Sequence, residues 1–426
     1  MRSLTRGVML SAMVFLAGTA AAATFDVNLT ADDRDSDPGD GVCRAELSVG
    51  CTLRAAIQEA NALAGNDVIN LPAGTFTLTI TGAGEDNAAA GDLDVRETLW
   101  IYGQGMDATR INAAGIDRVF DLRLGVLQLV DLTVTGGRAT SLDGALGGGI
   151  RASGERLVIG SCRLTGNVAN QGGAIFASAS TAVQIADSVL DGNATENTGI
   201  TNPWGAAIRA EGGLELSGST VTGNTGASAG NFAVDAQCFN GTVLILNSTV
   251  AANSCSGIGT YNCDAVLSHV TVAENSSYGV NMGSYLNDAD ITVVNSIVAG
   301  NNFDCYFQPS QTVTIDHCLD GDDTCGLIGA NGDLPMTDPQ LLPLRNWGGM
   351  TQTMYPRPVV SPVIDAGDGA ACYITDQRGE VRGGDGNGDG SSGCDMGAVE
   401  AGDLVFYDDL ESASTDFWSA AAGLVP

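Results

Sequence analysis

Two acidic residues near the middle of the chain, Glu211 and Asp235, have the chemistry and spacing of a catalytic pair. Both lie in short alternating stretches typical of β-strands, and strand rise and strand spacing place their carboxyl groups about 8 Å apart on an outer surface. An inverting glycosidase holds its two carboxyl groups about 6.5–9.5 Å apart, which leaves room for a water molecule. Polysaccharide hydrolysis is therefore the catalytic hypothesis, although the 50 acidic residues of this chain offer many such pairs.

Other catalytic arrangements find little support in the sequence. The two histidines, His269 and His317, are not in a metal-binding spacing, and no serine lies in a Gly-flanked nucleophile motif. All 18 basic residues are arginine, so a pectate-lyase-like reaction has no lysine to serve as its base. We therefore expect a protein without catalysis, and keep a hydrolase or lyase using Glu211 and Asp235 as the alternative.

One loop has the ligand spacing of a calcium site. In DGNGDG, Asp385, Asn387 and Asp389 alternate ahead of Gly390, as at the start of an EF-hand loop. The twelfth position is Met396 instead of a bidentate carboxylate, so a merely polar, Gly-rich loop is the alternative. We expect no required cofactor, and calcium at these three residues is the one candidate.

Charge and the N-terminal segment indicate where the protein works. The formal charge of −32 repels nucleic acid, anionic lipid and polyanions, whereas neutral glycans and calcium suit it. Residues 1–23 combine a basic start, a short apolar run and an Ala-rich end, which predicts a secretory signal peptide. No later segment has the length of a membrane span. We expect a secreted protein, extracellular or at the bacterial cell surface, that contacts an extracellular glycan or another cell-surface component.

An internal repeat predicts the elements that position these residues. Six similar stretches, from IGSCRLTGN to VNSIVAGN, end at Asn167, Asn193, Asn224, Asn253, Asn275 and Asn301. Spacings of 22 to 31 residues indicate a solenoid, and short alternating runs within each unit indicate strands. Asparagine tolerates left-handed backbone angles, and its side chain can bond the next unit of a stack. The predicted fold class is all-β, a right-handed parallel β-helix of about eight to ten coils.

A second set of stretches, from GGGIRA to YGVNM, aligns into two columns. The inward column is Ile150, Ile175, Ile208, Val234, Ile258 and Val280. Because side chains alternate along a strand, the next residues form an outward column of Arg151, Phe176, Arg209, Asp235, Gly259 and Asn281.

The outward column supports two interpretations. In the favoured one it is scaffold, with Arg209 paired to Asp235 on the surface and Arg151 over the ring of Phe176. In the other, a long insertion brings Trp204 beside Phe176 as a second stacking platform for sugar rings. Arg151 and Arg209 would then bind sugar hydroxyls or carboxylates.

The N-terminal flank resembles that of secreted β-helix proteins with a CSLREA domain. The signature here is CTLRAAI, starting at Cys51, and it departs from the family at Thr52 and Ala55. The change at Ala55 removes an acidic partner for Arg54. Independently, Thr52 suits the N-cap of a helix whose apolar face includes Ile57, so we expect a short helix that covers the first coil.

Two further resemblances cover the rest of the chain. The middle is similar to polymorphic outer-membrane protein repeats through GGAI, Gly172 to Ile175. The stretches NWGGMTQTM, SPVIDAGD, DQRGEVR and CDMGAVE resemble the choice-of-anchor Q domain, and their arginines and acids are expected to hold backbone groups of a cap. Together the resemblances imply export and a β-helix, and no defined reaction.

Eleven cysteines in an exported chain predict disulfides. The expected pairs are Cys43–Cys51 across a short loop, Cys372–Cys394 around the DGNGDG loop, and Cys238–Cys263 on coils about 4.8 Å apart. The choice-of-anchor Q resemblance implies a fourth pair, Cys305–Cys325. Cys162, Cys255 and Cys318 are left over.

The predicted organisation has five parts. They are a signal peptide (1–23), a CSLREA-like N-terminal cap and first coil (24–80), β-helix repeats (81–320), a disulfide-tied, choice-of-anchor-Q-like C-terminal cap (321–400) and an acidic, aromatic tail (401–426). We expect an exported, adhesin-like or glycan-contacting scaffold.

Overall fold

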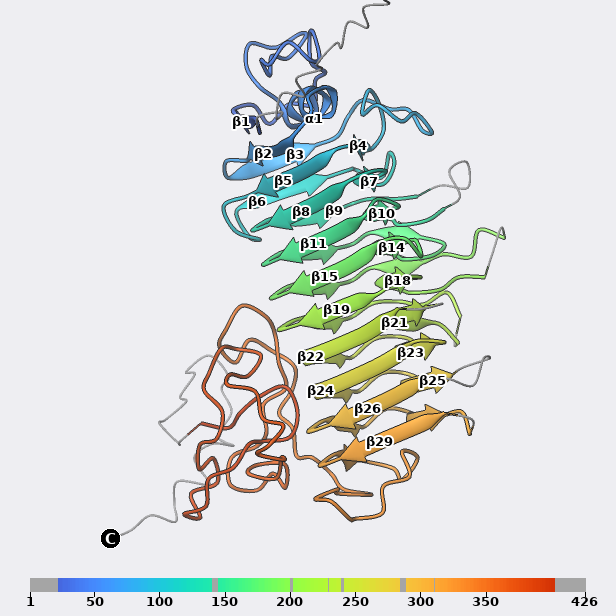
Figure 1. Ribbon diagram of the computed structural model, residues 1–426, viewed down its shortest axis with the longest axis vertical. Coiled ribbons are helices and arrows are strands. Elements are labelled where there is room, and N and C mark those ends of the chain that lie inside the picture. The colour runs from blue at the N-terminus through green and yellow to red at the C-terminus, as the bar shows by residue number, and fades with distance from the viewer. Residues whose placement is uncertain are drawn as a thin grey trace, which may run out of the picture.

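The computed structural model describes residues 22–139, 145–199, 202–228, 230–238, 241–283, 289–309 and 311–402. The expected signal peptide (1–23) and tail (401–426) lie almost entirely outside these ranges. Within them the chain winds into a parallel β-helix, as its repeats predict (Figure 1). No helix of the described residues is long and apolar enough to cross a membrane.

One face of the β-helix is a nine-stranded parallel sheet. Its strands are β4 (Leu93–Val95), β7 (Phe120–Leu122), β10 (Ile150–Ala152), β14 (Ile175–Ala177), β18 (Ile208–Ala210), β21 (Phe232–Gln237), β23 (Ser256–Tyr261), β25 (Tyr278–Gly283) and β28 (Phe303–Phe307). The predicted inward column is confirmed, because its six residues pair in register and are at most 1% exposed.

The other two faces belong to one 19-stranded sheet that bends at a corner. The strands before the corner are β2 (Asn66–Asn70), β5 (Thr98–Tyr102), β8 (Val126–Val130), β11 (Arg156–Gly160), β15 (Ala182–Ala186), β19 (Leu214–Ser217), β26 (Asp290–Val294) and β29 (Thr312–Asp316). Those after it are β3 (Gly74–Thr77), β6 (Thr109–Asn112), β9 (Thr133–Thr135), β12 (Arg163–Thr165), β16 (Val189–Asp191), β20 (Thr220–Thr222), β27 (Ile297–Ala299) and β30 (Leu319–Asp320). β22 (Thr242–Ala251) and β24 (Asp264–Ala273) run through the corner, and β13 (Val168–Ala169) pairs with β17 (Ala194–Thr195).

A column of residues with positive φ makes this corner. We call Ser161, Asp187, Gly218, Asn247, His269, Asn295 and His317 the corner column; their φ values run from 44° to 57°. The strand register places them one above another on successive coils. Asparagine, aspartate, histidine and glycine tolerate this left-handed conformation better than other residues, which explains most of the residue types found there.

The six asparagines of the repeat form a continuous ladder inside the helix. From Asn193 onward, each side-chain oxygen accepts hydrogen bonds from the backbone and side-chain nitrogens of the previous asparagine; for Asn224 and Asn193 these are 3.0 and 3.1 Å. The ladder runs from Asn167 to Asn301 and ends on the carboxylate of Asp304. The predicted bonding between asparagines is therefore present over the whole repeat region.

The N-terminal end is closed by helix α1 (Leu53–Ala62), and β1 (Thr24–Asp26) pairs with β2. Thr52 is the N-cap, as predicted, and its hydroxyl accepts from the amide of Ala55 at 3.2 Å. Arg54 is buried and pairs with Asp32 at 2.6 Å. Asp32 is thus the acidic partner of Arg54 in this chain.

The C-terminal segment takes a path that the sequence did not suggest. Residues 321–335 close the end of the solenoid, where Leu327 joins its core. Residues 336–401, which we call the strap, fold back along the side of the β-helix next to the corner column (Figure 1). Within the strap Arg378 pairs with Asp376 at 2.8 Å, and Arg382 donates to the side chain of Asn247 at 2.9 Å. These arginines hold backbone and side chains, as expected, at a lateral contact instead of an end cap.

Four disulfides are present, and they join the cysteines paired in the sequence analysis. They are Cys43–Cys51, Cys238–Cys263, Cys305–Cys325 and Cys372–Cys394. The remaining Cys162, Cys255 and Cys318 are free and buried. Burial raises the pKa of each of these thiols to about 12, so they are inert, small apolar residues.

Candidate functional site

The outward side chains of the nine-stranded sheet form one row along the whole β-helix. We call this row, defined by strand register, the outer row: Asp94, Asp121, Arg151, Phe176, Arg209, Asp235, Gly259, Asn281 and Tyr306. It contains the outward column predicted from the sequence and extends it in both directions. The chemistry available on this face changes along the row from acidic, through arginine-rich, to aromatic.

The middle of the outer row is covered, which corrects the expectation of an exposed column. Phe176 is only 7% exposed and Arg209 only 6%. Side chains on neighbouring strands stand about 4.8 Å apart, so long arginine stems shield what lies between them. The ion pair between Arg209 and Asp235 exists, at 2.9 Å, but it is buried instead of lying on the surface.

The proposed catalytic pair is tied to the same arginine. Arg209 contacts Asp235 at 2.9 Å and Glu211 at 3.7 Å. Burial raises the pKa of Asp235 to about 6, and the Arg209 charge opposes this rise. Because Asp235 has no exposed surface, a polysaccharide cannot reach it. The geometry therefore gives the hydrolase hypothesis no support.

The predicted platform of Phe176 and Trp204 is not assembled. Trp204 is partly exposed and pairs through its backbone with Gln171 on the preceding coil. Among the described residues no ring contact joins Trp204 to Phe176. Arg151, the remaining predicted ligand-binding residue, forms an ion pair with Asp121, its neighbour in the row.

The first carboxyl groups of the outer row are buried. Asp121 is held by Arg151 and by Arg123, at 3.0 Å from the latter. Asp94 instead accepts one hydrogen bond, from the amide of Ala88 at 2.7 Å, and its Oδ1 atom has no hydrogen-bond partner. Burial raises the pKa of Asp94 to about 7. The acidic end is thus a buried part of the scaffold, and Asp94 is its carboxyl group with a raised pKa.

The opposite end of the outer row carries exposed aromatic rings. Phe303 and Tyr306 on β28 are 45% and 46% exposed, and Tyr278 on β25 contacts both. The rings of Tyr278 and Phe303 stack with centroids 5.4 Å apart, and Tyr278 and Tyr306 are 6.0 Å apart. We call these three residues the aromatic end. Asn281, partly exposed, pairs in register with Tyr306 and adds a polar amide.

A glycine in the outer row, Gly259, makes room for a further ring beside the aromatic end. An added Cβ on Gly259 would lie 2.6 Å from the ring of Phe232, so this ring covers the glycine. Phe232 meets Tyr261 edge to face, with centroids 6.4 Å apart. Phe303 and Tyr306 were not predicted, because the aligned column stops at Asn281, one coil short of the stretch FDCYF.

The predicted calcium loop is closed by its own polar side chains. The carboxylate of Asp385 accepts from the amides of Gly388, Asp389 and Gly390 at 2.8–3.1 Å, and Asn387 accepts from Asp389 at 2.9 Å. All four contacts are exposed to solvent. The three predicted ligands thus share one surface loop.

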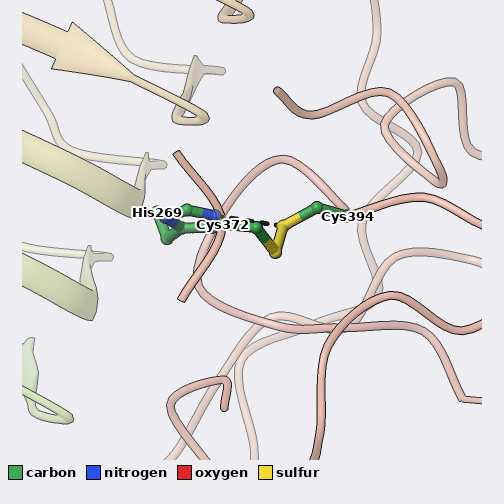
Figure 2. A group of neighbouring side chains, drawn as sticks. All are labelled: His269, Cys372 and Cys394. Atoms are coloured by element: carbon green, nitrogen blue, oxygen red, sulfur yellow. Dashed lines mark hydrogen bonds between the residues drawn. A yellow bond between two sulfur atoms is a disulfide. The ribbon is translucent and has the colours of Figure 1, made fainter. Parts of the chain in front are cut away.

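The strap buries a histidine beside a disulfide where it crosses the corner column (Figure 2). His269 Nε2 lies 3.2 Å from Cys394 Sγ, and Nδ1 lies 3.1 Å from Ser268 Oγ. Because Cys394 is bonded to Cys372, neither sulfur is free to bind a metal. Burial, with the charge of Arg382, lowers the pKa of His269 to about 3, so the imidazole is neutral. This group is a packing contact of the strap.

Comparison with known proteins identifies the fold. No family model and no curated protein matches the sequence. Pectate lyase Pel9A matches with a TM-score of 0.52 and 15% identity, over 90% of this chain and 97% of that one. The A-modules of the Azotobacter vinelandii mannuronan C-5 epimerases AlgE6 and AlgE4 match with TM-scores of 0.42 and 0.40 and identities of 17% and 19%. They cover 62% and 63% of this chain and 69% and 70% of theirs. The pectate lyase match establishes a shared parallel β-helix fold.

Proposed function

We propose that this chain is an exported scaffold that binds a glycan, without altering it chemically, at the aromatic end of its outer row. The exposed pair Phe303 and Tyr306 is the observation that carries the proposal. Aromatic rings present flat apolar faces, and the C–H groups of a sugar ring pack on such faces. Because Tyr278 stacks on Phe303 and also contacts Tyr306, the rings need little further ordering when a ligand arrives.

The charge of the chain narrows the class of glycan. At −32, the protein repels polyuronates and sulfated polymers unless cations intervene. Neutral polysaccharides fit the aromatic end better, because stacking and the amide of Asn281 require no opposite charge. The predicted signal peptide and the resemblances of the sequence to CSLREA, choice-of-anchor Q and polymorphic outer-membrane protein repeats all support display outside the cell, with an adhesin-like role.

The test compares ring removal at the aromatic end with removal of an apolar side chain elsewhere. A glycan array probed with residues 24–426 identifies the ligand, and titration calorimetry then measures its Kd. Each ring contact is worth about 0.5–1.5 kcal/mol, so Phe303→Ala with Tyr306→Ala should weaken binding about tenfold or more. Ile374→Ala, at an 83% exposed strap residue, should bind as the wild type does. Equal affinity of the double variant and the wild type for the glycan would contradict the proposal.

A separate assay of polysaccharide cleavage tests the alternative that the protein is a hydrolase or a lyase. Incubation with a panel of polysaccharides should release neither reducing ends nor unsaturated products. If products do form, and Glu211→Gln or Asp235→Asn abolishes them, the non-catalytic proposal is wrong.

Calcium at Asp385, Asn387 and Asp389 is a further part of the proposal, with a structural role in the strap. The alternating oxygen ligands on one exposed loop support it. Calcium should raise the melting temperature of the wild type and leave that of Asp385→Asn with Asp389→Asn unchanged. Calcium-independent melting of the wild type would exclude this site.

A further inference from the structure

A second cluster on the strap lies two coils beyond His269 in the corner column. His317 occupies the corner position after β29, Asp316 precedes it, and Asp368 comes from the strap. One ligand atom from each of these side chains lies within 4.8 Å of the other two, and all three residues are partly exposed. His317 Nδ1 is 2.9 Å from Asp316 Oδ1. In the group around His269 the two sulfur atoms are joined in a disulfide, whereas the ligand atoms of this cluster are not covalently bonded to one another.

Charge compensation also sets this cluster apart. Several other buried carboxylates are paired with arginines, for example Asp121 with Arg151 and Asp92 with Arg118, the latter at 2.7 Å. Among the described residues, the ion pair of Asp316 is with His317, and no arginine lies within ion-pair distance of Asp316 or Asp368. Two carboxylates and an imidazole therefore converge without a fixed cation.

We propose that Asp316, His317 and Asp368 bind one Zn²⁺ ion, which fastens the strap to the last coils of the β-helix. Zinc takes imidazole nitrogen and carboxylate oxygen at about 2.0–2.2 Å, so two ligand atoms on a tetrahedral ion lie about 3.3 Å apart. The 2.9 Å between His317 Nδ1 and Asp316 Oδ1 is close to this spacing. Three protein ligands leave a fourth position for water, which the partial exposure of the cluster allows. Calcium, which takes six to eight oxygens, fits poorly.

The backbone already holds these ligands in place. The amide of Asp368 donates to Asn295 Oδ1 at 2.7 Å, and its carbonyl accepts from Asn295 Nδ2 at 3.2 Å. Four residues further along, Cys372 is bonded to Cys394 of the same strap, and Cys394 Sγ lies 3.2 Å from His269 Nε2 of the corner column. His317 is fixed by its left-handed φ of 49°. Binding would therefore require only side-chain rotation, and the site does not depend on the proposed glycan function.

The test measures zinc binding by the full chain after treatment with EDTA. We expect one Zn²⁺ per chain in calorimetry, a higher melting temperature with zinc, and a visible absorption spectrum of tetrahedral cobalt when Co²⁺ replaces it. Loss of a group that merely orients a ligand weakens metal binding about 10- to 100-fold, so loss of a ligand should cost at least about tenfold. His317→Asn and Asp368→Asn should both show this loss.

The variants are chosen so that misfolding cannot imitate the result. Asparagine occupies the corner column at Asn247 and Asn295 with φ of 44° and 48°, so it suits the backbone at position 317. Asp368→Asn keeps the two backbone bonds to Asn295. Asp338→Asn, at an exposed carboxylate elsewhere on the strap, is the matched control and should bind zinc normally. Failure of the wild type to bind zinc, or undiminished binding by His317→Asn and Asp368→Asn, would overturn the proposal.

Discussion

Individual carboxyl groups on this acidic protein differ sharply in how their charge is balanced. Asp121 and Asp235 lie against arginines, whereas Asp94 is fully buried with one amide donor. An ionised carboxylate pays a large desolvation cost in such a place, and a proton removes this cost. Asp94 therefore links folding to pH.

The direction of this linkage follows from the raised pKa. The folded chain keeps a proton on Asp94 up to about pH 7, whereas the unfolded chain releases it near 3.8. Stability from this group is thus complete below about pH 4 and declines as the pH rises towards 7, by at most about 1.4 kcal/mol per pH unit. In Asp94→Asn the free energy of unfolding should fall less steeply as the pH rises. At about pH 8 the variant should therefore have a larger free energy of unfolding than the wild type.

Urea titrations at several pH values would check this prediction. The free energy of unfolding of Asp94→Asn should still decrease somewhat with pH, because burial also raises the pKa of the neighbouring Asp92 to about 8. Asp290→Asn, at an exposed residue on β26, should follow the wild-type curve. If Asp94→Asn and wild type have the same slope, the buried carboxyl group is ionised throughout.

At the scale of elements, the asparagine ladder is what joins one coil to the next. Asn224 is buried; its side-chain oxygen accepts from Asn193, and its side-chain nitrogen donates to the carbonyl of Leu190 and to Asn253. Asn224→Ala leaves several of these groups buried without partners, at about 1–3 kcal/mol each. We expect a total loss of about 2–4 kcal/mol in the free energy of unfolding.

Chemical denaturation monitored by far-ultraviolet circular dichroism would measure that loss. Asn202→Ala, at an exposed position in a loop, is the control and should change stability by less than about 0.5 kcal/mol. A similarly small effect at Asn224 would mean that stacking of the apolar column, and not the ladder, holds the coils together.

Much of this element-scale structure could be predicted from the sequence, for a physical reason. The asparagines and the column from Ile150 to Val280 recur once per coil, because every coil presents the same environment to the same position. Alternation along a strand also showed that Phe176 points outward. It could not show that neighbouring side chains cover Phe176, because coverage depends on side-chain lengths on adjacent coils.

The candidate site was less accessible to sequence reasoning. Tyr306 follows the last asparagine of the repeat, but its stretch FDCYF has Asp304 where the aligned stretch YGVNM has Gly279. The meeting of Asp316 and His317 with Asp368 depends on the path of the strap, which no local pattern encodes. Long-range placement of an irregular segment follows from its packing, and packing has no period in the sequence.

At the scale of the molecule, the strap converts a stack of coils into one body. Gln377 anchors it by hydrogen bonds: its side chain accepts from Thr249 at 2.7 Å and donates to Thr220 at 3.0 Å, and it also donates to Thr351 of the strap at 2.9 Å. Gln377→Ala should release the strap locally while the β-helix stays folded. Loss of about 1 kcal/mol or slightly more would increase the open population about five- to tenfold.

Limited trypsin digestion would detect this opening, because Arg378, which follows Gln377 and precedes Gly379, is a partly buried cleavage site on the strap. Cleavage in the strap should accelerate by the same factor in Gln377→Ala, and circular dichroism of the β-helix should be unchanged. Gln352→Ala, which removes an exposed side chain nearby, should digest at the wild-type rate. Simultaneous cleavage throughout the β-helix would show that strap and solenoid unfold as one unit.

The strap also determines how the molecule would carry tension. The described chain ends at Gly402, whose amide donates to the hydroxyl of Tyr355 within the strap at 3.0 Å. A solenoid pulled from its last coil opens one coil at a time, since each coil contacts only its neighbours. Force entering at Gly402 instead reaches strap contacts at Gly218, Asn247 and Asn295 on separate coils. A pulling force would act on these contacts at the same time and along the side of the β-helix. A chain held by its C-terminus would therefore resist extension better than the same coils without the strap.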